Sequence, residues 1–144
     1  MRTGAITLSI GSHSENVFLI GLAINKIAAS IPVTEQAAFE MEVAVVEAVN
    51  NAIEHAHHHN PAKQVTVEVR LETDIVRFTI IDQGAPIDFE AAMDAAAGME
   101  NAPQIERGRG FGIIRALMDE IKYQRNGCAN YVTLLKYLKQ PSEP

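Results

Sequence analysis

The sequence predicts an α/β two-layer sandwich, in which a mixed, largely antiparallel sheet carries helices on one face. Hydrophobic periodicity gives the elements in the order β-α-α-β-β-α-α-β-β. Two pairs of consecutive strands are joined by short connections, which indicates antiparallel hairpins. Two long amphipathic segments carry apolar stripes that need a sheet to cover.

One strand and one helix open the chain. Residues 5–10 alternate apolar and polar side chains, as a half-buried strand does. Ser14 is expected to cap a helix that runs to about residue 30. Pro32 ends this helix, because proline lacks the backbone donor that a helix interior needs.

The second helix is the longest and carries the central motif. Thr34 is expected to cap it, and residues 39–56 read FEMEVAVVEAVNNAIEHA. Its apolar residues are expected to share one broad side, namely Phe39, Val43, Val45, Val46, Val49, Ala52, Ile53 and Ala56. The polar side is expected to hold Glu40, Glu47, Asn51 and Glu54, with Ala44 between the first two. Glu47 and Asn51 are one turn apart and therefore point the same way.

A hairpin and a short helix follow. Residues 65–71 alternate as a strand does, and residues 75–81 are predicted to return as a more apolar strand, which we expect to be the more central one. The motif from Asp82 to Pro86 ends that strand. Asp88 is expected to start an alanine-rich helix that ends near residue 97. Residues 98–107 lack periodicity and are predicted to form an active-site lid loop.

The chain ends with a helix and a second hairpin. A helix is expected over about residues 112–119, after a glycine-rich stretch. Strands are expected over residues 121–125 and 128–138. The Asn126-Gly127 pair between them predicts a type I′ turn.

Composition limits the class of protein. The 144 residues fit one domain, which we assign to residues 1–144. The net charge is −6 and the basic residues are dispersed, so nucleic acid is not an expected partner. The longest apolar run, residues 17–24, is too short to span a bilayer, and the N-terminus lacks a signal segment. We therefore expect a cytoplasmic protein with no membrane association.

Histidines at the end of the long helix raise the question of a metal site. His55, His57, His58 and His59 lie close together in sequence. Adjacent histidines at a fraying helix end point in different directions, and no carboxylate lies nearby at ligand spacing. A solvated connector is the favoured interpretation. Cys128 is the single cysteine, so no internal disulfide is possible.

Glu47 and Asn51 suggest chemistry on a magnesium-bound nucleotide. An amide oxygen suits Mg²⁺, which prefers hard oxygen ligands and keeps several waters and phosphate oxygens. Glu47, one turn earlier, would be placed to take a proton from an attacking hydroxyl or water. Phosphoryl transfer mainly requires positioning and charge neutralisation, so one base and one metal ligand suffice. A solvated helix face is the alternative for this pair taken alone.

Two later motifs fit the same ligand. The carboxylate of Asp82 would accept from the exocyclic amine of adenine, and Gly84 would let a flat base lie against the backbone. Gly108, Gly110 and Gly112 could turn backbone amides toward phosphates at the start of a helix. An ordinary strand-to-turn Asp-x-Gly remains the alternative for the first motif. The P-loop and Rossmann patterns are both missing.

Together these three motifs resemble the nucleotide-binding boxes of the GHKL ATPase superfamily. The segments EAVNNAIEHAH, IDQGAPID and GRGFGIIRALMDEIKY are similar in sequence to those of the small bacterial anti-sigma-factor serine/threonine-protein kinases. The resemblance runs over nearly the whole chain. It implies the Bergerat ATP-binding fold, with ATP and Mg²⁺ as cofactors.

The resemblance also implies roles for residues and partners. Glu47 would be the general base and Asn51 the magnesium ligand. The ATP-binding residues would be Asn50, Asn51, His55, Asp82, Gly84, Arg107, Gly108, Arg109, Gly110, Phe111 and Gly112. Family members bind a sigma factor, phosphorylate a serine on an anti-sigma-factor antagonist, and are commonly homodimers. Two alternatives stay open: a non-catalytic ATP-binding module that sequesters a partner, and a histidine-kinase catalytic domain.

Overall fold

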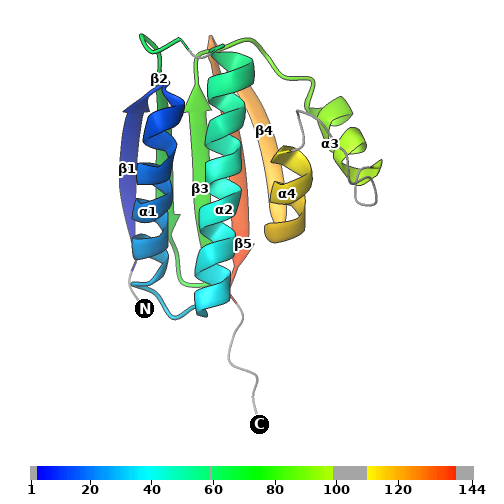
Figure 1. The fold of residues 1–144 in the computed structure, drawn as a ribbon. Coiled ribbons are helices and arrows are strands. Elements are labelled where there is room, and N and C mark those ends of the chain that lie inside the picture. The colour runs from blue at the N-terminus through cyan, green and yellow to red at the C-terminus, as the bar shows by residue number, and fades with distance from the viewer. Residues whose placement is uncertain (1–2, 59, 99–109, 139–144) are drawn as a thin grey trace.

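A five-stranded sheet with helices on one face forms the molecule (Figure 1). The computed structural model describes residues 3–58, 60–98 and 110–138. The strand order is β1-β2-β3-β5-β4, and the helices other than α3 (Phe89–Gly98), which lies beyond the β4 edge, cover one face of this sheet, which confirms the expected two-layer sandwich. All four pairings between these strands are antiparallel, so the expectation of a mixed sheet is wrong. Two helices connect β1 to β2. Because the chain reverses direction at each connection, β2 runs antiparallel to β1.

The strands match the predicted segments to within a few residues. They are β1 (Gly4–Gly11), β2 (Gln64–Leu71), β3 (Ile75–Asp82), β4 (Glu120–Asn126) and β5 (Ala129–Tyr137). Both predicted hairpins are confirmed, and β3 is central as expected.

The turn of the second hairpin differs from the prediction. Asn126 pairs with Ala129, so the turn residues are Gly127 and Cys128 rather than Asn126 and Gly127. Among non-glycine residues that the structure describes, only His58 has a positive φ, whereas Gly127 has φ +63°. A positive φ at the first turn residue alone is the pattern of a type II′ turn, whereas type I′ needs it at both.

The helices also follow the predicted order. A 3₁₀ turn (Ser14–Asn16) leads into α1 (Val17–Ala28). The others are α2 (Glu35–Asn51), a π-helical turn (Ala52–Ala56), α3 (Phe89–Gly98) and α4 (Gly110–Leu117).

The two predicted helix caps have different outcomes. Thr34 caps α2 as predicted, because its Oγ1 accepts from the Ala37 N–H at 3.0 Å. The cap assigned to Ser14 is wrong, since this residue lies inside the 3₁₀ turn and neither that turn nor α1 has a side-chain cap. Asp88 Oδ1 accepts from the Ala91 N–H at 3.1 Å at the start of α3.

The buried side of α2 differs from the predicted one. Phe39 is 59% exposed, whereas Ala44, which was placed among polar residues, is fully buried. The buried residues of α2 and the π-helical turn are Ala38, Met41, Ala44, Val45, Ala48, Val49, Ala52 and Ile53. Small alanines on this side let α2 lie close to β3, β5 and the flanking helices. Glu42 and Val46 pack beside Gly21 of α1, where a side chain would meet them.

No described helix has the length and apolar character that crossing a membrane requires.

Candidate functional site

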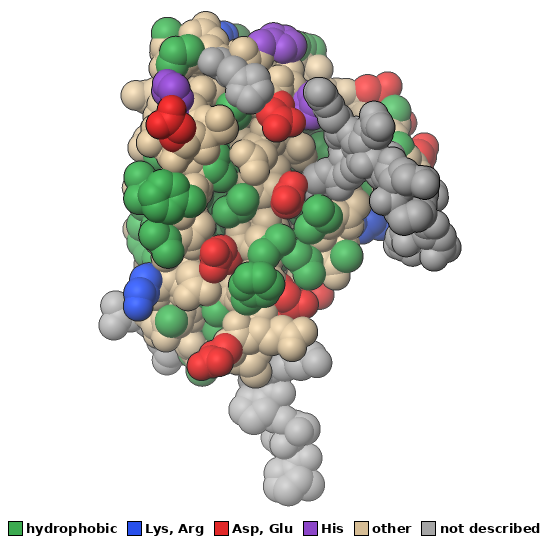
Figure 2. Space-filling view, viewed as in Figure 1, with side chains coloured by type: hydrophobic (Ala, Val, Ile, Leu, Met, Phe, Trp, Pro, Cys, Tyr) green, Lys and Arg blue, Asp and Glu red, His purple; other side chains and the backbone are tan. Residues whose placement is uncertain are grey.

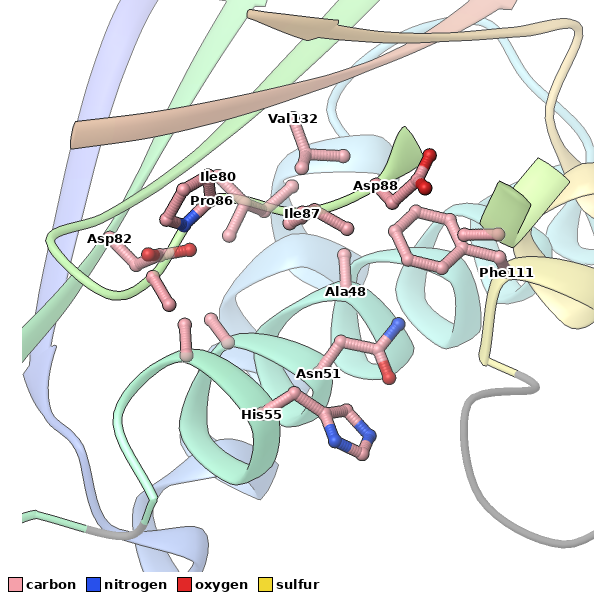
Figure 3. Close-up of a pocket in the computed structure, with 14 residues that line it drawn as sticks. Ala48, Asn51, His55, Ile80, Asp82, Pro86, Ile87, Asp88, Phe111 and Val132 are labelled. Atoms are coloured by element: carbon pink, nitrogen blue, oxygen red, sulfur yellow. The ribbon is translucent and has the colours of Figure 1, made fainter. Parts of the chain in front are cut away.

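A cavity of about 320 Å³ opens between the end of α2, the turn after β3 and the start of α4 (Figure 3). Ligand pockets of small molecules range from about 300 to 1,000 Å³, so a nucleoside fits this volume. Asn51, Asp82 and Phe111, from the three sequence motifs, all line it. The structure thus brings together residues from three separate parts of the chain.

The α2 wall of the cavity combines small residues with one amide. Ala48 and Ala52 leave space above the helix, and Asn51 projects into that space (Figure 3). Asn51 Nδ2 is buried and has no hydrogen-bond partner among the described residues. Leaving such a group unpaired costs about 1–3 kcal/mol, so the site favours a polar ligand at this position.

The π-helical turn continues this wall. The His57 N–H bonds to the carbonyl of Ala52 at 2.9 Å, five residues back rather than four. The insertion changes the direction of the side chains that follow it, and π-turns of this kind are frequent at functional sites. His55 consequently lines the cavity, as the resemblance implied, while its side chain remains partly exposed.

His57 is buried and connects three segments. Its Nε2 accepts from the Gln83 N–H at 3.1 Å, so the proton of the neutral ring lies on Nδ1. Nδ1 in turn donates to Ser12 Oγ at 3.0 Å. Burial lowers the pKa of His57; the Asp82 carboxylate opposes this shift and Lys63 adds to it. The neutral ring therefore supports the backbone directly after Asp82.

Asp82 lies buried at the end of β3 and faces the cavity. Its Oδ1 accepts from the Gly84 N–H at 2.8 Å and from Asn130 Nδ2 at 2.8 Å. Both bonds go to the same oxygen, which leaves Oδ2 as the oxygen available to a ligand. Gly84 itself packs against Ala56, and no Cβ would fit between them. Packing thus gives a second reason for glycine at this position.

A polar cluster behind the turn was not anticipated from the sequence. Asn130 is fully buried, and its Oδ1 accepts from Tyr123 Oη at 2.6 Å and Arg125 Nη1 at 3.0 Å. Arg125 Nη1 also donates to the Gly84 carbonyl at 2.6 Å. The structure pairs Asp82 with Asn130 and Asn130 with Arg125, a register that the predicted Asn126-Gly127 turn would not give.

Aromatic rings form the wall on the α4 side. Phe111 is buried and lines the cavity, with its ring edge-on to Phe89 at 6.1 Å. Phe89 stacks on Tyr123 at 5.7 Å, which links this wall to the polar cluster. Ile80 and Val132 of the sheet close the base of the cavity.

Glu47 does not line the cavity, although it lies one turn before Asn51 on α2. Its side chain is partly buried, and this burial raises its pKa, with the Glu54 carboxylate adding to the shift. A raised pKa makes a carboxylate a better proton acceptor near neutral pH. Asn50 is also partly buried and also lies outside the cavity lining.

The glycine-rich motif is only partly described. Arg107, Gly108 and Arg109 lie outside the described residues, as does most of the predicted lid. Gly110 begins α4, two residues earlier than predicted. A Cβ added at Gly112 would meet no atom of the described residues within 4 Å. Packing against the described residues therefore does not require glycine at position 112.

The described residues include no group of three or more His, Cys, Asp or Glu side chains that could hold a metal ion. A magnesium ion would instead depend on few protein ligands, with phosphate oxygens and waters completing its shell. The unpaired amide of Asn51 fits that requirement, because a half-turn of its terminal bond presents the oxygen instead of the nitrogen.

Comparisons with known proteins identify the family of this chain. The family described as Histidine kinase-like ATPase domain matches residues 12–136. This chain belongs to that family. The histidine kinase-like ATPase domain so defined covers the cavity and all three motifs.

Relatives of this ATPase domain are named as anti-sigma factors or serine-protein kinases. The chain is 32% identical over 119 residues to "Anti-sigma F factor" of Oceanobacillus iheyensis, covering 81% of this chain and 80% of the relative. It is 26% identical over 137 residues to "Serine-protein kinase RsbW" of Bacillus velezensis, covering 92% and 85%. A third relative, with the same name in Listeria innocua, is 28% identical over 140 residues, covering 94% and 88%.

Solved structures share the fold. The RsbU and RsbW domains of Rv1364c from Mycobacterium tuberculosis superpose with a TM-score of 0.69 at 18% identity, over 97% of this chain and 34% of that one. The Acinetobacter baumannii histidine kinase AdeS gives a TM-score of 0.51 at 16% identity, over 97% and 70%. This ATPase domain thus spans about a third of the mycobacterial chain.

Proposed function

We propose that this chain is an ATP-dependent serine/threonine-protein kinase that acts as an anti-sigma factor. It binds a sigma factor and phosphorylates a serine on an anti-sigma-factor antagonist. One observation carries the proposal: Asn51 and Asp82 face one nucleoside-sized cavity. The anti-sigma and serine-kinase relatives support it, because they match most of this chain at 26–32% identity.

The cavity residues divide the recognition of ATP between them. Asp82 accepts a hydrogen bond from the adenine amine, and the apolar wall around Phe111 and Ile80 packs against the base. Asn51 supplies an oxygen to Mg²⁺, which neutralises phosphate charge when bound. Gly108, Arg109, Gly110 and Gly112, with Arg107 beside them, hold the phosphates through backbone amides and guanidinium groups.

Glu47 acts as the general base. It takes the proton of the serine hydroxyl as the serine oxygen bonds to the γ-phosphorus of ATP. The bond from that phosphorus to the β,γ-bridging oxygen breaks, and ADP leaves with the electron pair. The raised pKa of Glu47 supports this role. His55, in the π-helical turn, lines the cavity and borders the nucleotide, whereas Asn50 of α2 lies outside the lining and would act on the nucleotide only indirectly.

We also propose that the protein forms a homodimer in the cytoplasm, where its partners act. Phe18, Leu19 and Leu22 of α1 are exposed, and Figure 2 shows hydrophobic side chains over this helix. The adjacent edge strand β1 contains no charged residue and no proline, so its free edge is open to another strand. Light scattering of the wild type should give twice the monomer mass, and a Leu22→Glu variant should give the monomer mass.

A non-catalytic module that sequesters its partner is the second candidate. The position of Glu47 outside the cavity lining favours it. In that case ATP would change the affinity for the partner without transfer of phosphate. Glu47→Gln would then leave partner binding and nucleotide binding unchanged.

The deciding experiment mixes the purified chain with Mg²⁺, γ-labelled ATP and a purified anti-sigma-factor antagonist. The kinase proposal predicts label on a serine of the antagonist, and loss of that label in Glu47→Gln. An unlabelled antagonist, together with retained ATP-dependent binding of a sigma factor, would establish the sequestering module instead. Acid-labile phosphate on a histidine would support the histidine-kinase alternative.

A further inference from the structure

Asn130 connects the nucleotide turn to the second hairpin. Its Nδ2 donates to Asp82 Oδ1 at 2.8 Å and to the Ala85 carbonyl at 2.8 Å, with a longer contact of 3.4 Å to the Gly84 carbonyl. Its Oδ1 accepts from Tyr123 and Arg125, as described above. Every hydrogen-bonding direction of this buried side chain is therefore used.

These partners fix the orientation of the amide. Arg125 can only donate, so the carbonyl oxygen of Asn130 must face it. The Ala85 carbonyl can only accept, so the amide nitrogen must face the turn. Tyr123 is fixed as well, because its hydroxyl accepts from the Ile87 N–H at 3.1 Å and donates to Asn130. A single arrangement satisfies the whole cluster.

The consequence for Asp82 is a fixed carboxylate. Asn130 and the Gly84 N–H both bind Oδ1, which holds the plane of the carboxylate in one orientation. Oδ2 is then held toward the cavity. Asn130 does not line the cavity itself, so it acts through Asp82 and through the carbonyls of the turn.

We propose that Asn130 is a positioning residue that sets the selectivity of this site for a purine carrying a 6-amino group. The inference rests on the proposed ATP binding and deepens it. A carboxylate held with one oxygen toward the base gains from an amine donor at that place. A carboxylate free to rotate divides its time between orientations and loses most of that preference.

The test compares ATP with purine riboside triphosphate, which lacks the 6-amino group. Calorimetry with Mg²⁺ gives Kd for both nucleotides, and their ratio reports the contribution of the amine. Wild type should prefer ATP by about tenfold or more, the value of one hydrogen bond to a charged group. In Asn130→Ala, ATP affinity should fall while that of the analogue changes little, so the ratio moves toward one.

Controls separate this role from a structural one. If Asn130 had only a structural role, Asn130→Ala would weaken the binding of both nucleotides equally and leave the ratio of their Kd values unchanged. That result would overturn the inference. In an Asp82→Asn background, Asn130→Ala should have no further effect on the ratio. Gln124→Ala, an exposed residue on the same hairpin, should leave both affinities unchanged.

A second variant keeps the test valid if Asn130→Ala does not fold. Tyr123→Phe removes only the hydroxyl that holds Asn130 and retains the ring stacking with Phe89. Tyr123→Phe should lower the preference for ATP over the analogue, by a smaller factor than Asn130→Ala does. An unchanged preference in a folded Tyr123→Phe protein would contradict the inference. Failure of the wild type to bind either nucleotide would instead contradict the proposed function.

Discussion

Gly84 and Ala56 are packed so closely that position 84 has no room for a side chain. A Cβ at this position would overlap both the Cβ and the carbonyl oxygen of Ala56. The contact joins the turn that directly follows Asp82 to the π-helical turn that carries His55. The geometry of the cavity therefore depends on a glycine that does not need to touch the ligand.

Gly84→Ala should destabilise the protein. Overpacking of this kind costs about 1–3 kcal/mol, and chemical denaturation measures the loss. Ala56→Gly should not restore stability in the double variant, because the backbone of Ala56 is also in the way. Gly112→Ala is the matched control: its Cβ meets none of the described residues, and helix propensity predicts a gain of up to about 1 kcal/mol. Equal stability of the two single variants would contradict the packing argument.

Asn51→Leu should separate stability from function. The leucine removes a buried amide that has no partner among the described residues, so the free energy of unfolding should rise by about 1 kcal/mol or stay unchanged. Magnesium-dependent ATP binding should be lost. Asn51→Ala should lose the same binding and also some packing. Titration calorimetry with and without Mg²⁺ measures ATP binding by both variants. If the magnesium dependence of ATP binding is unchanged, Asn51 is not a magnesium ligand.

Glu47→Gln should lower phosphate transfer by about 10²–10⁴-fold while ATP affinity is kept, because only the proton acceptor is lost. The pH dependence provides a second measurement. Transfer should fall as acid protonates Glu47, at a pH above the ordinary glutamate value of 4.5. Glu54→Gln removes one cause of the raised pKa, so this acidic limb should move to lower pH. A limb that does not move would show that another group titrates.

Stability should depend on His57 below neutral pH. Its pKa in the folded protein lies below 6.5, so the unfolded chain binds more protons as the pH falls. This contribution to stability is complete above about pH 6.5 and is lost as the pH falls through the folded-state pKa. Thermal unfolding across this range measures the effect. His57→Gln should flatten the dependence, and an equally steep curve in that variant would exclude His57 as its source.

Periodicity was sufficient to predict most of the fold. The sequence pattern predicted all five strands and both hairpins, because one face of each strand is more buried than the other. The buried side of α2 was predicted wrongly, because the pattern weighs large apolar residues such as Phe39 above small ones such as Ala44. Close approach of the helix to the sheet selects the small residues instead.

The candidate site was predictable where a motif carried its own chemistry. Asn51 and Asp82 face one cavity, as their residue types suggested. The π-helical turn was not predictable, because no pattern of side chains in residues 52–57 indicates that backbone hydrogen bonds there reach five residues back instead of four. Asn130 was missed because it was considered only as a strand residue, although a polar residue at an inward position of β5 opposite Asp82 was the available signal.

Calorimetric titration of Mg·ATP into the wild type and into Asp82→Asn shows whether this cavity binds adenine through Asp82. We expect one ATP per chain, dependence on Mg²⁺, and affinity about 10–100-fold weaker in the variant, with discrimination against GTP relaxed. A wild type that binds no ATP, or a variant that binds ATP and GTP as the wild type does, would contradict this expectation.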